Sequence, residues 1–166
     1  MKPALLVIDI QKAFYEDSET GAKFLRNAVG YLSYIIPLFR KKGYPVICIQ
    51  HMVKEYGLEP GNPDFDIPDD LPIEESDIHI HKEYSNSFNK TPLMEKLEEL
   101  DVDTVFITGY SALHCVLATY RGAQDRDLTP ILIRGAIAAD DPEEVRMAEK
   151  VGELVSYGAL KAFFGL

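Results

Sequence analysis

Four short runs of consecutive apolar residues constrain the fold of this chain more than any other feature of the sequence. They lie at residues 4–8 (ALLVI), 45–49 (PVICI), 104–108 (TVFIT) and 130–133 (PILI). Runs of this length with β-branched members are typical of strands that are buried on both faces, as in parallel sheets. A shorter candidate strand lies at 77–80. The chain therefore predicts a sheet that is covered on both sides.

Segments with helical periodicity separate these runs. Residues 21–42 carry apolar side chains at helical spacing, although Pro37 is expected to kink or shorten this helix. Thr91 is expected to cap the helix that follows it. Further helices are expected at 93–100, 112–126 and 142–154, with a short one near the C-terminus.

The alternation of strands and helices favours an α/β fold of Rossmann-like, three-layer type, with a mostly parallel central sheet and helices on both faces. Residues 55–75 hold several prolines and acids and predict a long loop, of the kind that often covers a functional site. The sequence has no internal repeat and no linker, so one domain is expected to span residues 1–166.

Charge and composition narrow the classes of partner. Lys and Arg number 17 against 27 Asp and Glu, a formal net charge of −10, which disfavours nucleic acid. No apolar segment is long enough for a signal-peptide core or a membrane span, so a cytoplasmic protein that does not bind membranes is expected. No glycine-rich phosphate loop follows residues 4–8, and no cofactor is expected.

In parallel α/β sheets, ligands bind at the carboxyl ends of the strands. This rule selects Asp9, Gln11, His51 and the segment 109–115, with Gly109 expected to end its strand. Asp9 has the chemistry of a general base, although a carboxylate at such a place is also a common loop cap.

Cys115 is the first candidate for a nucleophile. It lies near the start of a predicted helix, whose free N–H groups favour a thiolate and can also bind an oxyanion. The pKa of this thiol is therefore expected to be lowered, although the carboxylate of Asp9 opposes the effect, so that either side chain of the pair could hold the shared proton. The position alone fits a buried cysteine without chemistry equally well. Cys48 lies inside a predicted strand, and the core interpretation is favoured there.

Lys82 follows the alternating run IHIH, and its ammonium would lower the pKa of a nearby acid or thiol. Lys90 is its rival, but its place just before Thr91 favours a surface charge. The histidines His51, His79 and His81 raise a metal hypothesis, which the absence of an Asp-x-His pair near His51 disfavours. No catalytic metal is therefore expected.

Three motifs, taken in order, resemble the signature of the isochorismatase-like cysteine hydrolases, the superfamily of nicotinamidases, carbamoylsarcosine amidases and isochorismatases. They are VIDIQ at 7–11, KEYSNSFNKT at 82–91 and GYSALHCV at 109–116. Each motif alone is weak, and their order and spacing make the resemblance specific.

The resemblance implies a catalytic triad of Asp9, Lys82 and Cys115. It also implies a cis peptide bond between Tyr110 and Ser111, with the amides of Ser111 and Cys115 forming an oxyanion hole. The implied enzyme is a hydrolase that cleaves the C–N bond of a small amide or ureido substrate through an acyl group on Cys115. In that scheme Asp9 acts as the base and Lys82 stabilises the anions.

The sequence departs from the family pattern at some positions. Ala112 and Gly135 stand where the family often has Thr and Asp, His114 is unusual beside the cysteine, and the metal ligands of nicotinamidases are not recognisable. An isochorismatase-type ether hydrolase is one alternative, although the cysteine favours an amide substrate. A non-catalytic binding module on the same fold is the other.

The substrate itself is not identified by the sequence. The residues expected to contact it are Gln11, Phe14, His51, Tyr84, Phe88 and Tyr110. The resemblance also implies a homo-oligomer, either a dimer or a tetramer.

Overall fold

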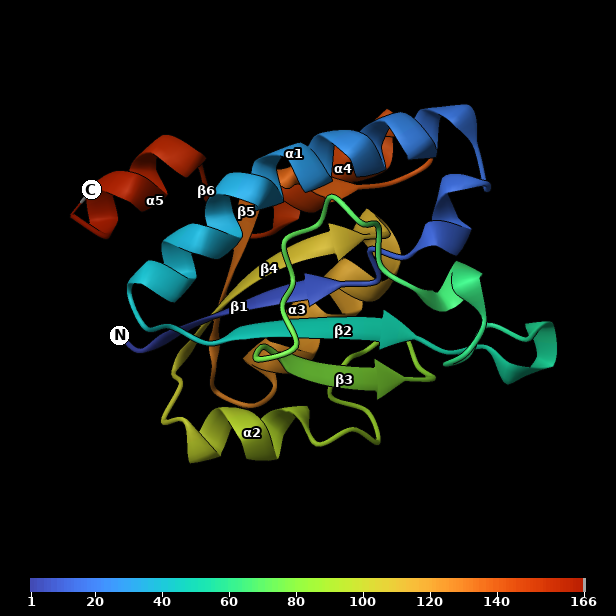
Figure 1. The fold of residues 1–166 in the computed structure, drawn as a ribbon. Helices are drawn as coiled ribbons and strands as arrows, with labels where there is room; N and C mark the ends of the chain where they lie inside the picture. The colour runs from blue at the N-terminus through green and yellow to red at the C-terminus, as the bar shows by residue number, and fades with distance from the viewer. Residues whose placement is uncertain (166) are drawn as a thin grey trace.

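The central sheet of the computed structural model, which describes residues 1–165, is parallel throughout. Its strands have the order β3-β2-β1-β4-β5-β6, and Figure 1 shows the central ones as arrows that point in one direction. The strands are β1 (Pro3–Ile8), β2 (Val46–His51), β3 (Ile78–Lys82), β4 (Thr104–Tyr110), β5 (Thr129–Ala138) and β6 (Leu154–Val155). This is the strand order of the Rossmann fold, with its reversal between β1 and β4.

Helices cover both faces of the sheet, as the sequence predicts. One face packs against α1 (Glu19–Lys41) and α5 (Tyr157–Phe163). The other packs against α2 (Leu93–Glu99), α3 (Leu117–Gln124) and α4 (Pro142–Val151). Residues of β1 alternate between the two cores, because successive side chains of a strand point to opposite faces. The prediction of a three-layer α/β fold is confirmed.

Helix α1 continues through Pro37 to Lys41, so the predicted shortening is wrong. Pro37 lies on the exposed side of the helix, where water can bond the carbonyl that lacks its usual N–H donor. The cap of α2 also differs from expectation, because Pro92 rather than Thr91 is the N-cap residue. The hydroxyl of Thr91 still accepts a hydrogen bond from the amide of Leu93, at 3.3 Å.

Two strands run further than their apolar runs suggest. Gly109 does not end β4 but lies within it, at a φ of 118°. A Cβ atom there would lie 1.9 Å from the carbonyl oxygen of Ile8, so only glycine allows β4 to pair closely with β1. Strand β5 continues past Ile133 to Ala138, through Gly135 at a φ of 84°. Its true end therefore lies five residues beyond the apolar run.

The segment between β2 and β3 is the long loop that the sequence predicts, with short 3₁₀ turns at Lys54–Tyr56 and Pro63–Phe65. The side-chain amides of Gln11 and Gln50 donate to the carbonyl of Phe65, at 3.2 and 2.9 Å, and hold this loop against the sheet. Another 3₁₀ turn, Lys12–Tyr15, follows β1. Within residues 1–165, no helix has the length and apolar character needed to cross a membrane.

Candidate active site

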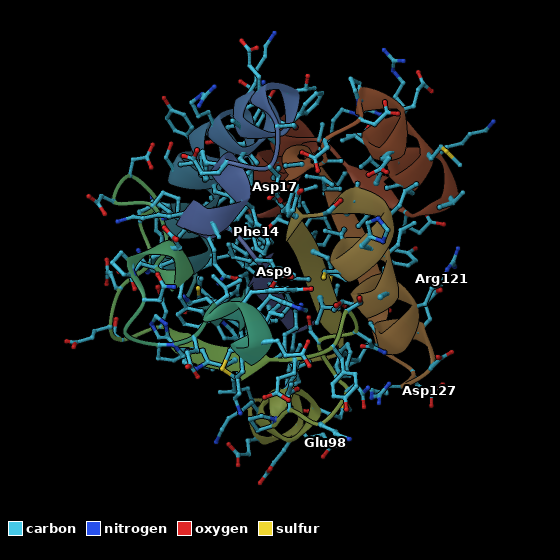
Figure 2. All side chains as sticks on the ribbon, turned by 90° about the vertical axis from the view of Figure 1, so that its right-hand side faces the viewer. Asp9, Phe14, Asp17, Glu98, Arg121 and Asp127 are labelled. Atoms are coloured by element: carbon cyan, nitrogen blue, oxygen red, sulfur yellow. The ribbon has the colours of Figure 1, made fainter. Side chains whose placement is uncertain are left out.

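The candidate site lies at the carboxyl edge of the sheet, where β1 and β4 diverge. Asp9 follows β1, and the segment Tyr110–Cys115 continues from the end of β4. Figure 2 looks onto this edge and shows Asp9 near its centre, with Phe14 and then Asp17 above it. This is the point in an open parallel sheet at which adjacent loops leave in opposite directions and leave space for a ligand.

Lys82 ends β3 and brings a buried ammonium to the centre of this edge. Its Nζ lies 2.7 Å from Oδ2 of Asp9, 2.8 Å from Nδ1 of His51 and 3.3 Å from Sγ of Cys115. An ammonium has three N–H donors, and each of these contacts uses one of them. The side chain is fully buried, so its charge acts on these neighbours without the screening of bulk water.

The contact with Lys82 fixes the tautomer of His51. An ammonium can only donate, so Nδ1 of His51 accepts, and the proton of the neutral ring lies on Nε2. Burial lowers the pKa of His51, and the charge of Lys82 lowers it further. The imidazole is therefore neutral in the neutral pH range and offers an N–H donor.

Asp9 holds its carboxylate in an unusual way. Its φ of 53° is left-handed, a conformation that Asp adopts more readily than most residues and that turns the chain sharply after β1. Oδ2 accepts from Lys82, whereas Oδ1 is buried and has no hydrogen-bond partner within residues 1–165. Burial raises the pKa of Asp9 and outweighs the opposing charge of Lys82. The site thus contains a buried carboxylate oxygen that is free to accept a proton.

Cys115 does not have the lowered pKa that the sequence predicts. Burial and then the charge of Asp9 raise the pKa of its thiol to about 12, and Lys82 opposes them only in part. The prediction fails because it counted the helix N-terminus and the ammonium but not the loss of water around the sulfur. Cys115 is nevertheless partly exposed, and Sγ lies within 4.8 Å of a carboxylate oxygen of Asp9.

The turn that carries Cys115 is π-helical, spanning Ala112–Val116, before α3 begins. The amides of His114 and Val116 donate to the carbonyl of Ser111, at 3.0 and 3.2 Å. Neither bond uses the amide of Ser111 or of Cys115, the two groups that the family resemblance assigns to an oxyanion hole. The peptide bond between Tyr110 and Ser111 is cis, as that resemblance implies.

A cavity of about 330 Å³ opens beside Cys115 and is large enough for a small molecule. Phe14 and Tyr110 stack in its wall, with ring centroids 5.1 Å apart. The lining residues are Asp9, Phe14, His51, Val53, Ser85, Tyr110, Ser111, His114, Cys115, Asp140 and Glu144. The cavity brings together Asp9, Cys115, Ser111 and three of the expected substrate contacts, namely Phe14, His51 and Tyr110. In the segment between β2 and β3, only Val53 lines the cavity, and no residue of the predicted loop 55–75 does.

The remaining expected contacts lie elsewhere. Gln11 is fully buried: its side-chain carbonyl accepts from the amide of His51 at 2.6 Å, and its side-chain NH₂ donates to the carbonyls of His51 and Phe65. These bonds position His51, and Gln11 does not line the cavity. Tyr84 is 39% exposed and borders a separate pocket, where its hydroxyl accepts from Lys90 at 2.8 Å.

Phe88 is a core residue of the face that α2 and α3 cover, and it is only 5% exposed. The guanidinium of Arg126 lies over its ring, 4.8 Å from the centroid. This ring thus packs within the protein and does not line the cavity. The aromatic pattern of the sequence could not separate Phe88 from Phe14, because each follows a strand and only packing distinguishes them.

One set of side chains within residues 1–165 has the spacing of metal ligands. One donor atom each from Asp9, His51 and Cys115 lies within 4.8 Å of the other two. The ammonium of Lys82 already contacts all three residues, so these donors surround a cation that belongs to the chain. His79 and His81 are exposed on the other face of β3 from Lys82, away from this set. The expectation of no catalytic metal stays a prediction.

Besides Asp9, the cavity is lined by two acids that sequence reasoning missed, Asp140 and Glu144. Asp140 comes two residues after β5, so the strand-end rule would have selected it had the strand been given its full length. The apolar run 130–133 ends before the strand does, because Arg134 and Gly135 interrupt the hydrophobic pattern. Glu144 lies in the first turn of α4, whose N-cap residue Asp141 accepts a hydrogen bond from the amide of Glu143.

Known proteins resemble this chain in sequence and in fold. The family model described as the Isochorismatase domain matches residues 3–155. The isochorismatase family protein YrdC of Bacillus subtilis is 36% identical over 140 residues, which cover 83% of this chain and 74% of that relative. The crystal structure of N-carbamoylsarcosine amidase from Thermoplasma acidophilum has a TM-score of 0.80 at 26% identity, covering 94% of this chain and 95% of that one.

A cysteine hydrolase from Pseudomonas syringae pv. phaseolicola has the same fold, with a TM-score of 0.86 at 23% identity, covering 99% of this chain and 92% of that one. The match of the family model over most of the chain, together with the identity to the Bacillus relative, settles the assignment. The chain belongs to the isochorismatase family of hydrolases.

Proposed function

We propose that this hydrolase cleaves the C–N bond of a small amide or ureido substrate through an acyl group held on Cys115. The observation that carries the proposal is the buried ammonium of Lys82, which contacts Asp9 and Cys115 at once, beside a cavity of about 330 Å³. A thiol, an acceptor carboxylate and a fixed positive charge are the groups that nucleophilic attack on a carbonyl requires.

In the first half of the reaction, Oδ1 of Asp9 accepts the proton of the Cys115 thiol as the sulfur attacks the substrate carbonyl carbon. The carbonyl oxygen becomes an oxyanion, which the amides of Ser111 and Cys115 bind. The carbon–nitrogen bond then breaks, and Asp9 returns its proton to the departing nitrogen. An amine or ammonia leaves, and a thioester remains on Cys115.

In the second half, water attacks the thioester and gives a proton to Asp9. The thiolate leaves and recovers that proton, so the acid product departs and the resting site is restored. The raised pKa of Asp9 supports this role, because a carboxylate with a raised pKa is a stronger base towards a thiol. The ammonium of Lys82 stabilises whichever of the two groups carries the negative charge.

The test is a screen of small primary amides and ureido acids with the intact protein and with Cys115→Ser and Cys115→Ala. We expect hydrolysis with a burst of the first product and a transient mass increase on the peptide that contains Cys115. Both variants should lose turnover. Turnover of an enol ether that survives Cys115→Ala would instead support an ether hydrolase, and the absence of any turnover would support a binding module.

A further inference from the structure

We propose that the substrate of this site carries a positively charged nitrogen group, which Asp140 and Glu144 bind in the cavity beside Cys115. This inference rests on the proposed thiol hydrolase and names the class of its substrate: a small amide or ureide that also carries an amine. It excludes the anionic amides and ureido acids as preferred substrates.

The charge of the cavity wall is the first argument. Asp140 and Glu144 both line the cavity, and its lining includes no lysine or arginine within residues 1–165. Lys82 does not line the cavity, and its ammonium is already bonded to Asp9. A substrate carboxylate would therefore meet two like charges, whereas an ammonium would meet two opposite ones, the exposed Asp140 and the partly buried Glu144.

The second argument is that the hydrogen-bond donors to Asp140 and to its neighbour Asp17 are all neutral. Tyr110 donates to Oδ2 of Asp140 at 2.7 Å and lies 3.3 Å from Oδ2 of Asp17, so one hydroxyl sits between two carboxylates. Ser18 donates to the other oxygen of Asp140, at 2.5 Å. These are neutral donors, and no cation bonds to either acid within residues 1–165. Burial and the charge of Asp140 raise the pKa of Asp17, as expected where negative charge is not compensated.

Glu144 is the acid that remains free for a ligand. Its side chain is partly buried and lines the cavity, and it makes no hydrogen bond or ion pair within the part of the chain that the structure describes. Its neighbour Glu143 pairs with Arg146 on the outside of α4. Asp9, which also lines the cavity, has the unpartnered buried oxygen Oδ1. The cavity thus has free carboxylate acceptors, and its lining within residues 1–165 includes no lysine or arginine to pair with them.

The aromatic wall is the third argument. The stacked rings of Phe14 and Tyr110 line the same cavity as the catalytic groups and the acids, and the hydroxyl of Tyr110 bonds to Asp140. The faces of aromatic rings attract a desolvated cation, but they have no such attraction for a carboxylate. A chain of a few methylene groups, lying along these rings, would place an amine near Glu144 while its amide carbon lies at Cys115.

The test measures alkylation of Cys115 by three N-substituted iodoacetamides that differ in charge. The substituents are trimethylammonioethyl, the equally shaped neutral 3,3-dimethylbutyl, and carboxyethyl. Each rate is divided by the rate with 2-mercaptoethanol, which removes differences in intrinsic reactivity. At low salt we expect the cationic probe to label Cys115 at least about tenfold faster than the anionic one, with a smaller ratio at high salt.

Glu144→Gln should reduce that ratio several-fold, and Glu144→Lys should reverse the order of the probes. The matched control is Glu143→Lys, which changes the net charge equally on the neighbouring residue but outside the cavity, and it should leave the order unchanged. An anionic probe that labels as fast as the cationic one, or a ratio that Glu144→Lys leaves intact, overturns the inference.

Turnover separates this inference from the proposed function. Among 4-aminobutanamide, pentanamide and succinamate, the cationic amide should have the highest kcat/KM, and Glu144→Lys should lower that preference. Hydrolysis that depends on Cys115 but favours succinamate leaves the proposed function standing and overturns the charge preference. A cationic preference in labelling without hydrolysis of any amide supports the charge preference and counts against the hydrolase.

Discussion

The two cysteines of this chain occupy contrasting environments and yet share one property. Cys48 lies inside β2 and is 1% exposed, whereas Cys115 lies in a π-helical turn at the carboxyl edge of the sheet. Burial raises the pKa of both thiols to about 12. Only Cys115 has a buried ammonium, a free carboxylate oxygen and an open cavity beside it. The comparison teaches that reactivity here depends on a partner that takes the proton during attack, not on a thiolate in the resting state.

Replacing each cysteine tests this contrast with the largest expected effect. Cys115→Ala should reduce kcat by about 10⁴-fold or more, because it removes the proposed nucleophile. Cys48→Ala should leave kcat/KM nearly unchanged and lower the free energy of unfolding by about 1–2 kcal/mol, since it opens a small cavity in the core. Amide hydrolysis and urea unfolding measure the two effects. Loss of activity in Cys48→Ala alone would reverse the assignment.

Removing the base sharpens the comparison further. Asp9→Asn should lower kcat by about 10³-fold, because the amide cannot accept the thiol proton. The same change removes the negative charge that raises the pKa of Cys115, so this thiol should alkylate faster at a fixed pH. Paired measurements of turnover and of iodoacetamide labelling detect the two opposite responses. Unchanged turnover, or slower labelling of Cys115, would contradict the role of Asp9 as the base.

Removing the ammonium should have the opposite effect on the reactivity of the Cys115 thiol. Lys82→Met should lower kcat by about 10²-fold and slow the alkylation of Cys115, because the charge that favours its thiolate is gone. It also leaves the buried Asp9 without its partner, which costs about 3–5 kcal/mol of stability. The double variant Asp9→Asn/Lys82→Met should be more stable than Lys82→Met alone. Lys90→Met, at the surface, is the control and should change neither property.

His51 should contribute the smallest effect, which depends on pH. Its pKa is lowered in the folded protein, so protonation favours the unfolded state. The free energy of unfolding should therefore fall as pH drops from about 6.5 towards the lowered folded value, and recover as pH rises. Protonated His51 also cannot accept from Lys82, so activity should fall in the same range.

His51→Gln keeps an acceptor for Lys82 and removes the titration. It should cost less than about tenfold in kcat and should flatten the acid limb of both the activity and the stability profiles. His79→Gln, on the far side of β3, is the matched control and should retain the limb. An acid limb of activity that persists unchanged in His51→Gln would contradict the role of this residue.

The sequence predicts the architecture well because parallel strands buried on both faces leave uninterrupted apolar runs, as at residues 4–8. It fails where a local signal conflicts with tertiary context. Gly109 reads as a strand end, but β4 continues through it because the close approach of Ile8 requires glycine there. Pro37 reads as a helix breaker, but its exposed position allows α1 to continue.

The features of the candidate site also divide into those that the sequence predicts and those that depend on tertiary context. The residues that a strand end positions, such as Asp9 and Lys82, could be selected from spacing and family resemblance. The pKa of Cys115 could not, because it depends on how much water the surrounding side chains exclude. Gln11 and Phe88 also show this limit, because the sequence selected both as substrate contacts. Hydrogen bonds direct Gln11 into the protein, and packing in the core does the same for Phe88.

The most direct test of the central claim is competitive labelling of the two thiols with iodoacetamide near pH 8, followed by peptide mass spectrometry. Each rate is compared with that of the same peptide in urea-unfolded protein, where both cysteines are accessible. We predict that Cys115 of the folded protein alkylates at least about tenfold faster than Cys48, because only Cys115 is partly exposed and has Lys82 and Asp9 beside it. Equal labelling, or faster labelling of Cys48, would contradict the assignment of Cys115 as the nucleophile.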